Sequence, residues 1–215
     1  WNVLLTLGDR WARGIVVSSL GHVLTCAHFV RNHEDDPISV TFRDGSCSKA
    51  SVVFSAAKGC PWDIALVRVL GGHCSTFVNI FQASPRRAVS GDPCHVIGNH
   101  LFGPEIAKSI GPVFLSGTVA KVVEVGKRPV MLLSTAPSYD GASGGAVTDL
   151  NGGLIGMSTS NLEGAGDKPA VCLAIPVEVL AEIFCCGLTD GTSAFDVQRS
   201  IDTFQSKFTS EEQRS

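Results

Sequence analysis

The chain lacks the features that mark several common classes of protein. No apolar run approaches the ~20 residues that a helix needs to cross a bilayer, so we expect no membrane span. Its 17 Lys and Arg are outnumbered by 20 Asp and Glu and form no dense run, which argues against nucleic acid as a partner. Charged residues make up only 17% of the chain and apolar residues 44%, which argues against disorder. A length of 215 residues suits one globular unit or two small half-domains.

The N-terminus has neither an initiator methionine nor a basic leader. Trp1 to Leu7 has the pattern of a strand rather than that of a signal peptide. We therefore expect the chain to be part of a longer precursor.

Cysteine spacing gives no sign of a metal site. No C-x-x-C pair occurs, and the adjacent residues of His73-Cys74 and of Cys94-His95 would point to opposite faces of a strand. The eight cysteines allow a disulfide framework, but we expect most of them to be free, small, buried residues of an intracellular protein. Their positions are 26, 47, 60, 74, 94, 172, 185 and 186.

Most of the chain has the pattern of short β-strands separated by Gly, Pro, Asn and Asp. Beyond the first segment, strands are predicted at 14–17, 22–25, 38–42, 64–69, 94–98, 117–123 and 130–133. Residues 43–46 and 150–153 carry turn chemistry, the second set between two apolar runs as in a hairpin. Regular short strands with few helices favour an all-β barrel or sandwich.

Two helices are predicted near the end of the chain. The first runs from Pro176 to Phe184, with Pro at its start. In the second, Ser193 and Asp196 occupy the positions of a capping box. Its apolar residues recur at spacings of four, three and four, at Val197, Ile201, Phe204 and Phe208. This helix either docks on its own domain or forms a homo-oligomer through the tail, and the sequence leaves both open.

The most informative segment runs from Gly141 to Gly145. Small residues around Ser143 leave room for a substrate carbonyl, and glycine allows backbone angles that aim two N–H groups at one point. Gly-x-Ser-x-Gly also marks the nucleophile of α/β-hydrolases, but those enzymes place the histidine after the serine. All six histidines precede Ser143, so that alternative is excluded.

A nucleophilic serine needs a base, and the base needs a carboxylate that orients it. His28 follows an apolar strand, and Asp63 precedes another. Each residue alone is more often structural. However, Thr-x-Ala-His, Asp-Ile-Ala-Leu and Ser-Gly-Gly occur here in the order His, Asp, Ser, which chymotrypsin-like enzymes use. The combination predicts a catalytic triad of His28, Asp63 and Ser143.

This triad predicts a serine endopeptidase that acts on protein or peptide substrates through an acyl-enzyme. The backbone N–H groups of Gly141 and Ser143 would form the oxyanion hole. The chemistry requires no metal and no organic cofactor.

The same motifs, at 14–30, 63–67 and 141–145, resemble the trypsin-like and Deg/HtrA-like serine proteases. Further stretches, at 96–104, 116–123, 155–161 and 174–176, resemble the peroxisomal (glyoxysomal) leader-peptide-processing proteases. The likeness spans roughly residues 1–185. It implies two six-stranded chymotrypsin-like β-barrels with a C-terminal helix. The protease domain would then cover 1–186, with its halves split near 90–115, and a helical tail would cover 187–215.

The resemblance also implies a substrate class and a cellular location. Family members remove targeting presequences from imported peroxisomal matrix proteins, often beside a cysteine, and process themselves. The residues expected to bind substrate are Pro137, Ser138, Ser158, Thr159, Ser160 and Asn161. The chain ends Gln213-Arg214-Ser215 rather than in a Ser-Lys-Leu address, so either the C-terminus has been cut, or the protein enters the peroxisome by another route, or it resides elsewhere in the cell.

Two departures from trypsin-like zymogens bear on activation. Ala142 stands where those zymogens carry an Asp, and Trp1 is not the small aliphatic N-terminus that such an Asp would bind. Activation by burial of a new N-terminus is therefore not expected.

Two other functions stay open at this point. One is a general quality-control protease of the Deg/HtrA type. The other is an inactive protease fold that serves as a binding module, whose signature would be the loss of a triad residue. None of the three residues is missing.

Overall fold

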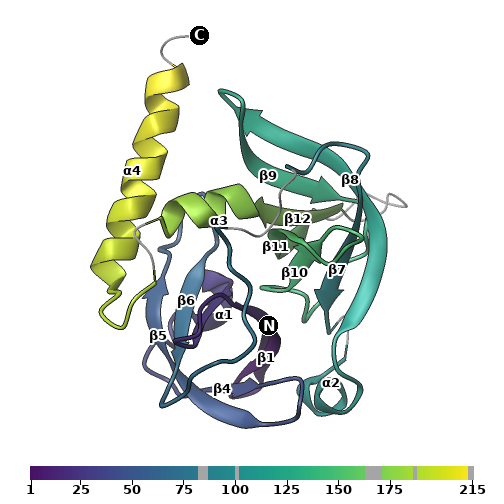
Figure 1. Cartoon of the computed structure of the whole chain (residues 1–215), viewed down its shortest axis with the longest axis vertical. Coiled ribbons are helices and arrows are strands. Elements are labelled where there is room, and N and C mark those ends of the chain that lie inside the picture. The colour runs from purple at the N-terminus through teal and green to yellow at the C-terminus, as the bar shows by residue number, and fades with distance from the viewer. Residues whose placement is uncertain (82–86, 100–101, 163–170, 186–187, 213–215) are drawn as a thin grey trace.

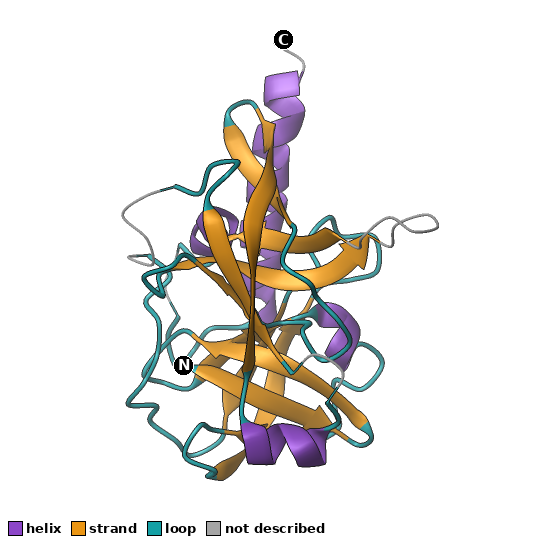
Figure 2. Ribbon diagram, turned by 90° about the vertical axis from the view of Figure 1, so that its right-hand side faces the viewer, coloured by secondary structure: helices purple, strands orange, loops and turns teal. Residues whose placement is uncertain are grey.

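The computed structural model describes residues 1–81, 87–99, 102–162, 171–185 and 188–212. Its strands form two closed six-stranded barrels, which confirms the predicted fold class. Figure 1 shows the two barrels side by side, with helix α3 lying across their junction. Figure 2, turned by 90°, shows the two groups of strands one above the other.

The first barrel is built from the N-terminal strands in the order β1-β2-β3-β6-β5-β4. All its pairings are antiparallel, and β1 closes the barrel by pairing with both β2 and β4. The predicted strand at 22–25 has the bounds expected of it. The strands are β1 (Asn2–Leu7), β2 (Arg10–Val16), β3 (His22–Thr25), β4 (Ile38–Thr41), β5 (Cys47–Ser55) and β6 (Ala65–Val69).

The second barrel repeats this architecture in the order β10-β11-β12-β9-β8-β7. Residues 150–153 connect β10 to β11, whose antiparallel pairing confirms the predicted hairpin. The strands are β7 (Pro93–Gly98), β8 (Val113–Val125), β9 (Arg128–Ser134), β10 (Ala146–Thr148), β11 (Leu154–Leu162) and β12 (Val171–Pro176).

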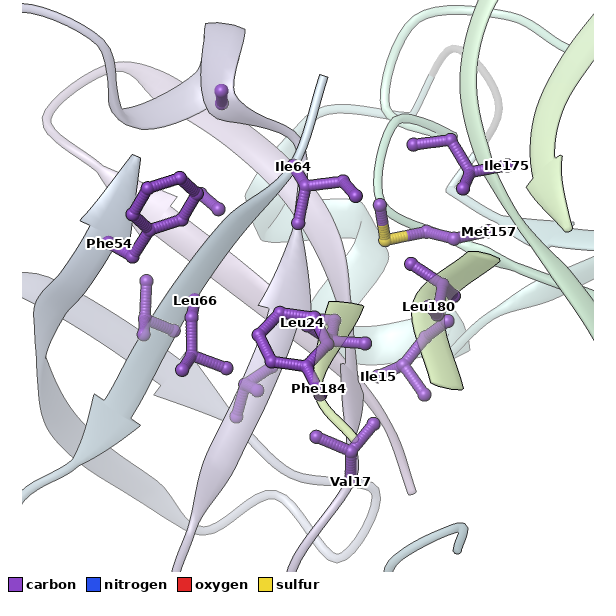
Figure 3. Packing of buried hydrophobic residues seen from close by; sticks show 14 of the residues in the cluster. Ile15, Val17, Leu24, Phe54, Ile64, Leu66, Met157, Ile175, Leu180 and Phe184 are labelled. Atoms are coloured by element: carbon purple, nitrogen blue, oxygen red, sulfur yellow. The ribbon is translucent and has the colours of Figure 1, made fainter. Parts of the chain in front are cut away.

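The main hydrophobic core runs from the first barrel into the junction. Figure 3 shows Ile15 and Leu24 of the first barrel on the side of Leu180 of α3 (Val177–Ile183), with Met157 of β11 beside that helix. All four side chains are fully buried. Because one cluster spans both barrels, their relative placement is held by packing as well as by chain connectivity. This placement decides whether residues from the two barrels can meet at one site.

The C-terminal helix α4 (Ala194–Glu212) packs on the first barrel. The Phe204 ring lies 4.9 Å from the Trp62 ring, centroid to centroid, and Val197 and Ile201 are buried as well. The apolar face formed by these three α4 residues is therefore covered by the chain's own domain, while oligomerisation through the tail stays a prediction. The side chain of Phe208 lies outside the described residues.

Polar contacts fix both ends of α4. The Ser193 hydroxyl donates to Asp196 at 2.6 Å, and the Asp196 N–H donates back to Ser193, which confirms the predicted capping box. Further along the helix, Lys207 pairs with Glu182 of α3, which also accepts from Arg128 of β9. Two shorter helices, α1 (Ala27–Val30) and α2 (Pro104–Ile110), complete the fold.

Two further findings concern predictions from composition. In the described part of the chain, no helix is both long and apolar enough to span a bilayer. The seven described cysteines, at 26, 47, 60, 74, 94, 172 and 185, are all free thiols. Cys186 lies outside the described residues.

Candidate active site

The three predicted triad residues come from loops and short turns at strand ends. His28 lies in the single-turn helix α1, three residues beyond the end of β3, and Asp63 lies two residues before β6. Because β3 and β6 are antiparallel neighbours in the barrel, the C-terminal end of β3 lies beside the N-terminal end of β6. Ser143 lies in the loop that precedes β10 on the second barrel.

His28 and Asp63 form a tightly hydrogen-bonded pair. His28 Nδ1 bonds to Asp63 Oδ2, and the His28 backbone N–H donates to Asp63 Oδ1 at 2.8 Å. Two bonds from one residue fix both the position and the tilt of the carboxylate. The arrangement leaves Nε2 as the ring nitrogen free to accept a proton.

The electrostatic surroundings keep this carboxylate ionised. Burial acts to raise the pKa of Asp63, but the hydrogen bonds and charge of His28, with help from Arg31, hold that pKa below its ordinary value. The Arg31 guanidinium lies 3.7 Å from Asp63 Oδ1. A charged Asp63 can therefore orient the imidazole and stabilise its protonated form.

The Ser143 loop requires glycine at two positions for steric reasons. Gly144 has φ +75°, and a Cβ there would lie 2.1 Å from the Arg13 carbonyl oxygen. Gly141 has φ +84°, and a Cβ there would lie 2.6 Å from Trp11 Nε1. Both φ values favour glycine, and in both places the first barrel leaves no room for a side chain.

Backbone hydrogen bonds anchor this loop to both barrels. The Arg13 N–H donates to the Ser143 carbonyl at 2.8 Å, and the Gly144 N–H donates to the Ser158 carbonyl at 2.8 Å. The N–H groups of Gly141 and Ser143, by contrast, have no partner among the described residues. Two unpaired donors in one tight loop are what stabilisation of an oxyanion requires.

The Ser143 hydroxyl does not point at the histidine. Ser143 Oγ donates to the Thr159 carbonyl at 3.3 Å, and within the described residues no hydrogen bond joins it to His28. Proton transfer to His28 therefore requires rotation of the Ser143 side chain. Catalytic hydrogen bonds are often loose in unliganded sites, so this geometry does not argue against the role.

The predicted substrate-binding residues gather on the second barrel beside Ser143. Asn161 Nδ2 donates to the Ser138 carbonyl at 2.7 Å, which joins β11 to the segment before the serine loop. Thr159 Oγ1 donates to the Leu173 carbonyl of β12. Ser138 is buried, whereas Pro137 and Ser160 are exposed. Their role in substrate binding stays a prediction.

Sequence reasoning did not identify three residues at this site. Cys172 contacts the Ser158 hydroxyl at 3.4 Å, and burial raises the pKa of its thiol, so the thiol is neutral. Arg13 is only 3% exposed, and burial lowers its pKa to about 10. Cys26 is fully buried beside the His28–Asp63 pair. Of the three, Arg13 reaches the Ser143 loop from the other barrel, and no local sequence pattern indicates that contact.

A separate cavity of about 1020 Å³ lies between the barrels. Trp1, Phe42, His73, His95 and Phe114 are among its lining residues, and no predicted triad residue lines it. The chemistry of His28, Asp63 and Ser143 therefore does not take place in this cavity.

Residues 12–157 match the family model described as trypsin-like peptidase domain. Two curated relatives carry the name peroxisomal leader peptide-processing protease. The Homo sapiens protein is 29% identical over 83% of this chain, and the Mus musculus protein is 30% identical over 83%. The chain spans about a third of the length of each, 31%. Serine endoprotease DegS of Haemophilus influenzae is 29% identical over 88% of this chain and 54% of its own length.

Solved structures share the fold at lower identity. The serine endoprotease of Yersinia pestis has a TM-score of 0.63 at 23% identity, covering 85% of this chain and 60% of its own. The HtrA-type protease AlgW, solved with a decapeptide, has a TM-score of 0.60 at 24% identity, covering 80% and 50%. These likenesses bear on the fold alone.

Proposed function

Since the chain belongs to the trypsin-like peptidase domain family and is a chymotrypsin-like serine peptidase, we propose that His28, Asp63 and Ser143 are its catalytic triad. The observation that carries the proposal is the placement of a hydrogen-bonded His–Asp pair on the first barrel opposite a glycine-rich serine loop on the second. Among the described histidines, His33 also hydrogen-bonds to a carboxylate, that of Asp36, but this pair is exposed in the turn after α1.

The mechanism follows from the contacts. The Ser143 hydroxyl leaves the Thr159 carbonyl and turns toward His28 Nε2, which takes its proton as Oγ attacks the scissile carbonyl. Asp63 holds the ring in the tautomer that keeps Nε2 free and stabilises the imidazolium. His28 then gives the proton to the leaving amine, and water hydrolyses the acyl-enzyme by the same steps in reverse.

The oxyanion hole comes from the unpaired N–H groups of Gly141 and Ser143. Negative charge develops on the carbonyl oxygen as the tetrahedral intermediate forms, and preorganised donors stabilise it without reorganisation. The backbone bonds that anchor the loop, such as that from Arg13 to Ser143, hold both donors in place.

Labelling with a fluorophosphonate probe tests this assignment. We expect a covalent adduct on Ser143 in the folded protein and none in Ser143→Ala. Ser51→Ala, at an exposed position on β5 of the first barrel, is the matched control and should label normally. Absence of an adduct in the folded wild-type chain would overturn the proposal and favour the inactive binding module.

We further propose limited processing as the task, namely removal of targeting presequences from imported peroxisomal matrix proteins, together with self-processing. Two relatives named peroxisomal leader peptide-processing protease support this substrate class and a peroxisomal location. The second candidate is a general Deg/HtrA-type protease, which the similarity to DegS favours.

Cleavage-site profiling separates the two tasks. Folded precursors that carry a presequence are offered together with a permanently unfolded protein, and Ser143→Ala serves as the blank. A processing enzyme is expected to cut each precursor once, at the presequence boundary. Faster cleavage of the unfolded protein at many sites would favour the Deg/HtrA-type function instead.

A further inference from the structure

We propose that a soft divalent cation, with Zn²⁺ as the representative, binds Cys26, His28 and Asp63 and thereby switches the peptidase off. The proposal concerns the regulation of the proposed triad and rests on that assignment. Cys26 Sγ, a ring nitrogen of His28 and a carboxylate oxygen of Asp63 all lie within 4.8 Å of one another. A thiolate, an imidazole and a carboxylate are the three kinds of side-chain ligand that zinc uses.

The three ligand groups need only small adjustments to hold the ion. Ligand atoms around tetrahedral zinc, at bond lengths of about 2.0–2.3 Å, lie roughly 3.3–3.8 Å apart. The separations of up to 4.8 Å therefore have to shorten by about an ångström, whereas His28 Nδ1 and Asp63 Oδ2, which are hydrogen-bonded to each other, have to move apart by about as much to admit the ion. Cys26 directly precedes α1, and rotation of the His28 and Asp63 side chains, with loss of the hydrogen bond between them, supplies the movement.

The site is reachable from solvent on one side. The side chains of His28 and Asp63 are 42% and 29% exposed, whereas Cys26 is fully buried beneath them. A cation can enter past the imidazole, and water can occupy the fourth position on the exposed side. Three protein ligands with one open position is the arrangement of zinc sites that are not purely structural.

Charge balance favours a divalent ion here. A lone thiolate at Cys26 would be costly, because the side chain is buried and its S–H donates to the Ser158 carbonyl at 3.4 Å. One thiolate and one carboxylate together neutralise a divalent cation, and the Arg31 guanidinium, 3.7 Å from Asp63 Oδ1, adds one positive charge beside the site. Metal binding releases the thiol proton to solvent.

Metal at this position is incompatible with catalysis. The ring atom that faces Asp63 is Nδ1, and coordination there moves the ring proton to Nε2. A histidine protonated on Nε2 cannot accept the Ser143 proton. The cation also replaces the hydrogen bond through which Asp63 orients the ring. Occupancy therefore abolishes base catalysis.

The experiment uses Zn²⁺ for inhibition and Co²⁺ for spectroscopy, in the full chain. Fluorophosphonate labelling of the wild type is expected to fall as Zn²⁺ rises, whereas Mg²⁺ should have no effect. Cys26→Ser should weaken the apparent Zn²⁺ affinity by more than the ~10–100-fold that loss of an outer-shell partner costs. For each variant, the labelling rate in the presence of Zn²⁺ is compared with the labelling rate of the same variant without metal. Cys47→Ser removes an exposed thiol and is the control, expected to respond like the wild type.

Spectroscopy separates failure of the metal site from failure of the proposed function. Ser143→Ala is expected to show a Co²⁺–thiolate charge-transfer band that Cys26→Ser lacks. Equal inhibition of Cys26→Ser and the wild type, or absence of the band, would overturn the metal site while leaving the triad intact. If the metal-free wild type never labels at Ser143, the proposed function fails, and the regulatory role fails with it.

Discussion

The two halves of the proposed active site are held in different ways. On the first barrel, side chains position the base, because His28 and Asp63 are joined by a ring hydrogen bond and a backbone-to-carboxylate bond. On the second barrel, the main chain positions the nucleophile, and the Ser143 hydroxyl itself points to Thr159. The base is thus fully oriented before substrate arrives, whereas the hydroxyl still has to turn. Each half should respond to a different kind of substitution.

The largest effect is expected from disrupting the side-chain contacts between His28 and Asp63 on the first barrel. Asp63→Asn keeps the shape of the residue but removes the charge, and its amide favours the wrong tautomer of His28. We expect kcat to fall by about 10⁴, with little change in the folded structure by circular dichroism. A loss of less than tenfold would show that Asp63 does not orient the base.

Displacing the main chain of the Ser143 loop on the second barrel should have the next largest effect. In Gly144→Ala the new Cβ meets the Arg13 carbonyl oxygen at 2.1 Å, so the loop must shift and misplace the oxyanion donors. We expect a rate loss of about 10²–10³, the range for loss of one such donor. Peptide hydrolysis by the purified variant measures it.

Gly152→Ala provides the matched control for this prediction. Gly152 has a similar φ of +80°, but a Cβ there would meet no atom within 4 Å. The Gly152→Ala variant should lose about 1 kcal/mol of unfolding free energy through backbone strain, as measured by urea unfolding, and should keep normal activity. Equal rate losses in the two variants would mean that φ, rather than the barrel contact, controls the loop.

A smaller effect on catalysis is expected from removing the packing next to Asp63 on the first barrel. Phe204→Ala takes away the ring that packs on Trp62, the residue before Asp63. We expect a stability loss of about 3–5 kcal/mol by denaturant unfolding and a modest loss of kcat at temperatures where the variant stays folded. Phe195→Ala on the same helix is the control, because Phe195 is 73% exposed. Equal destabilisation by both would contradict the packing described.

The smallest effect concerns the pH dependence of stability. It should come from Asp63, which belongs to the first-barrel half of the site. The folded pKa of Asp63 is depressed below its ordinary value of 3.8. Such a group stabilises the fold above its unfolded pKa, and this contribution is lost as the pH falls through the folded pKa. The wild type should therefore lose more stability in acid than Asp63→Asn, in urea titrations between about pH 5 and pH 2. Parallel losses would show that another carboxyl dominates.

Much of the fold was predictable because its signals are local. The strand at 22–25, the hairpin at 150–153 and the capping box of Ser193 and Asp196 each depend on a few adjacent residues. The helix α3 also followed from its apolar spacing. The short helices α1 and α2 were missed, since one or two turns carry too little periodicity to stand out.

The sequence by itself determined which residues the proposed triad contains. Small residues around Ser143, the apolar strands next to His28 and Asp63, and the order His, Asp, Ser are all properties of the chain. Only the tertiary structure decided what surrounds them. Cys26 reaches the Ser158 carbonyl across 132 residues of sequence, and Ser143 turns to Thr159 rather than to His28. The first contact depends on how two separately closed barrels pack together, and the second on the side-chain rotamer of Ser143 within the second barrel. Neither leaves a periodic signal in the sequence of the strands.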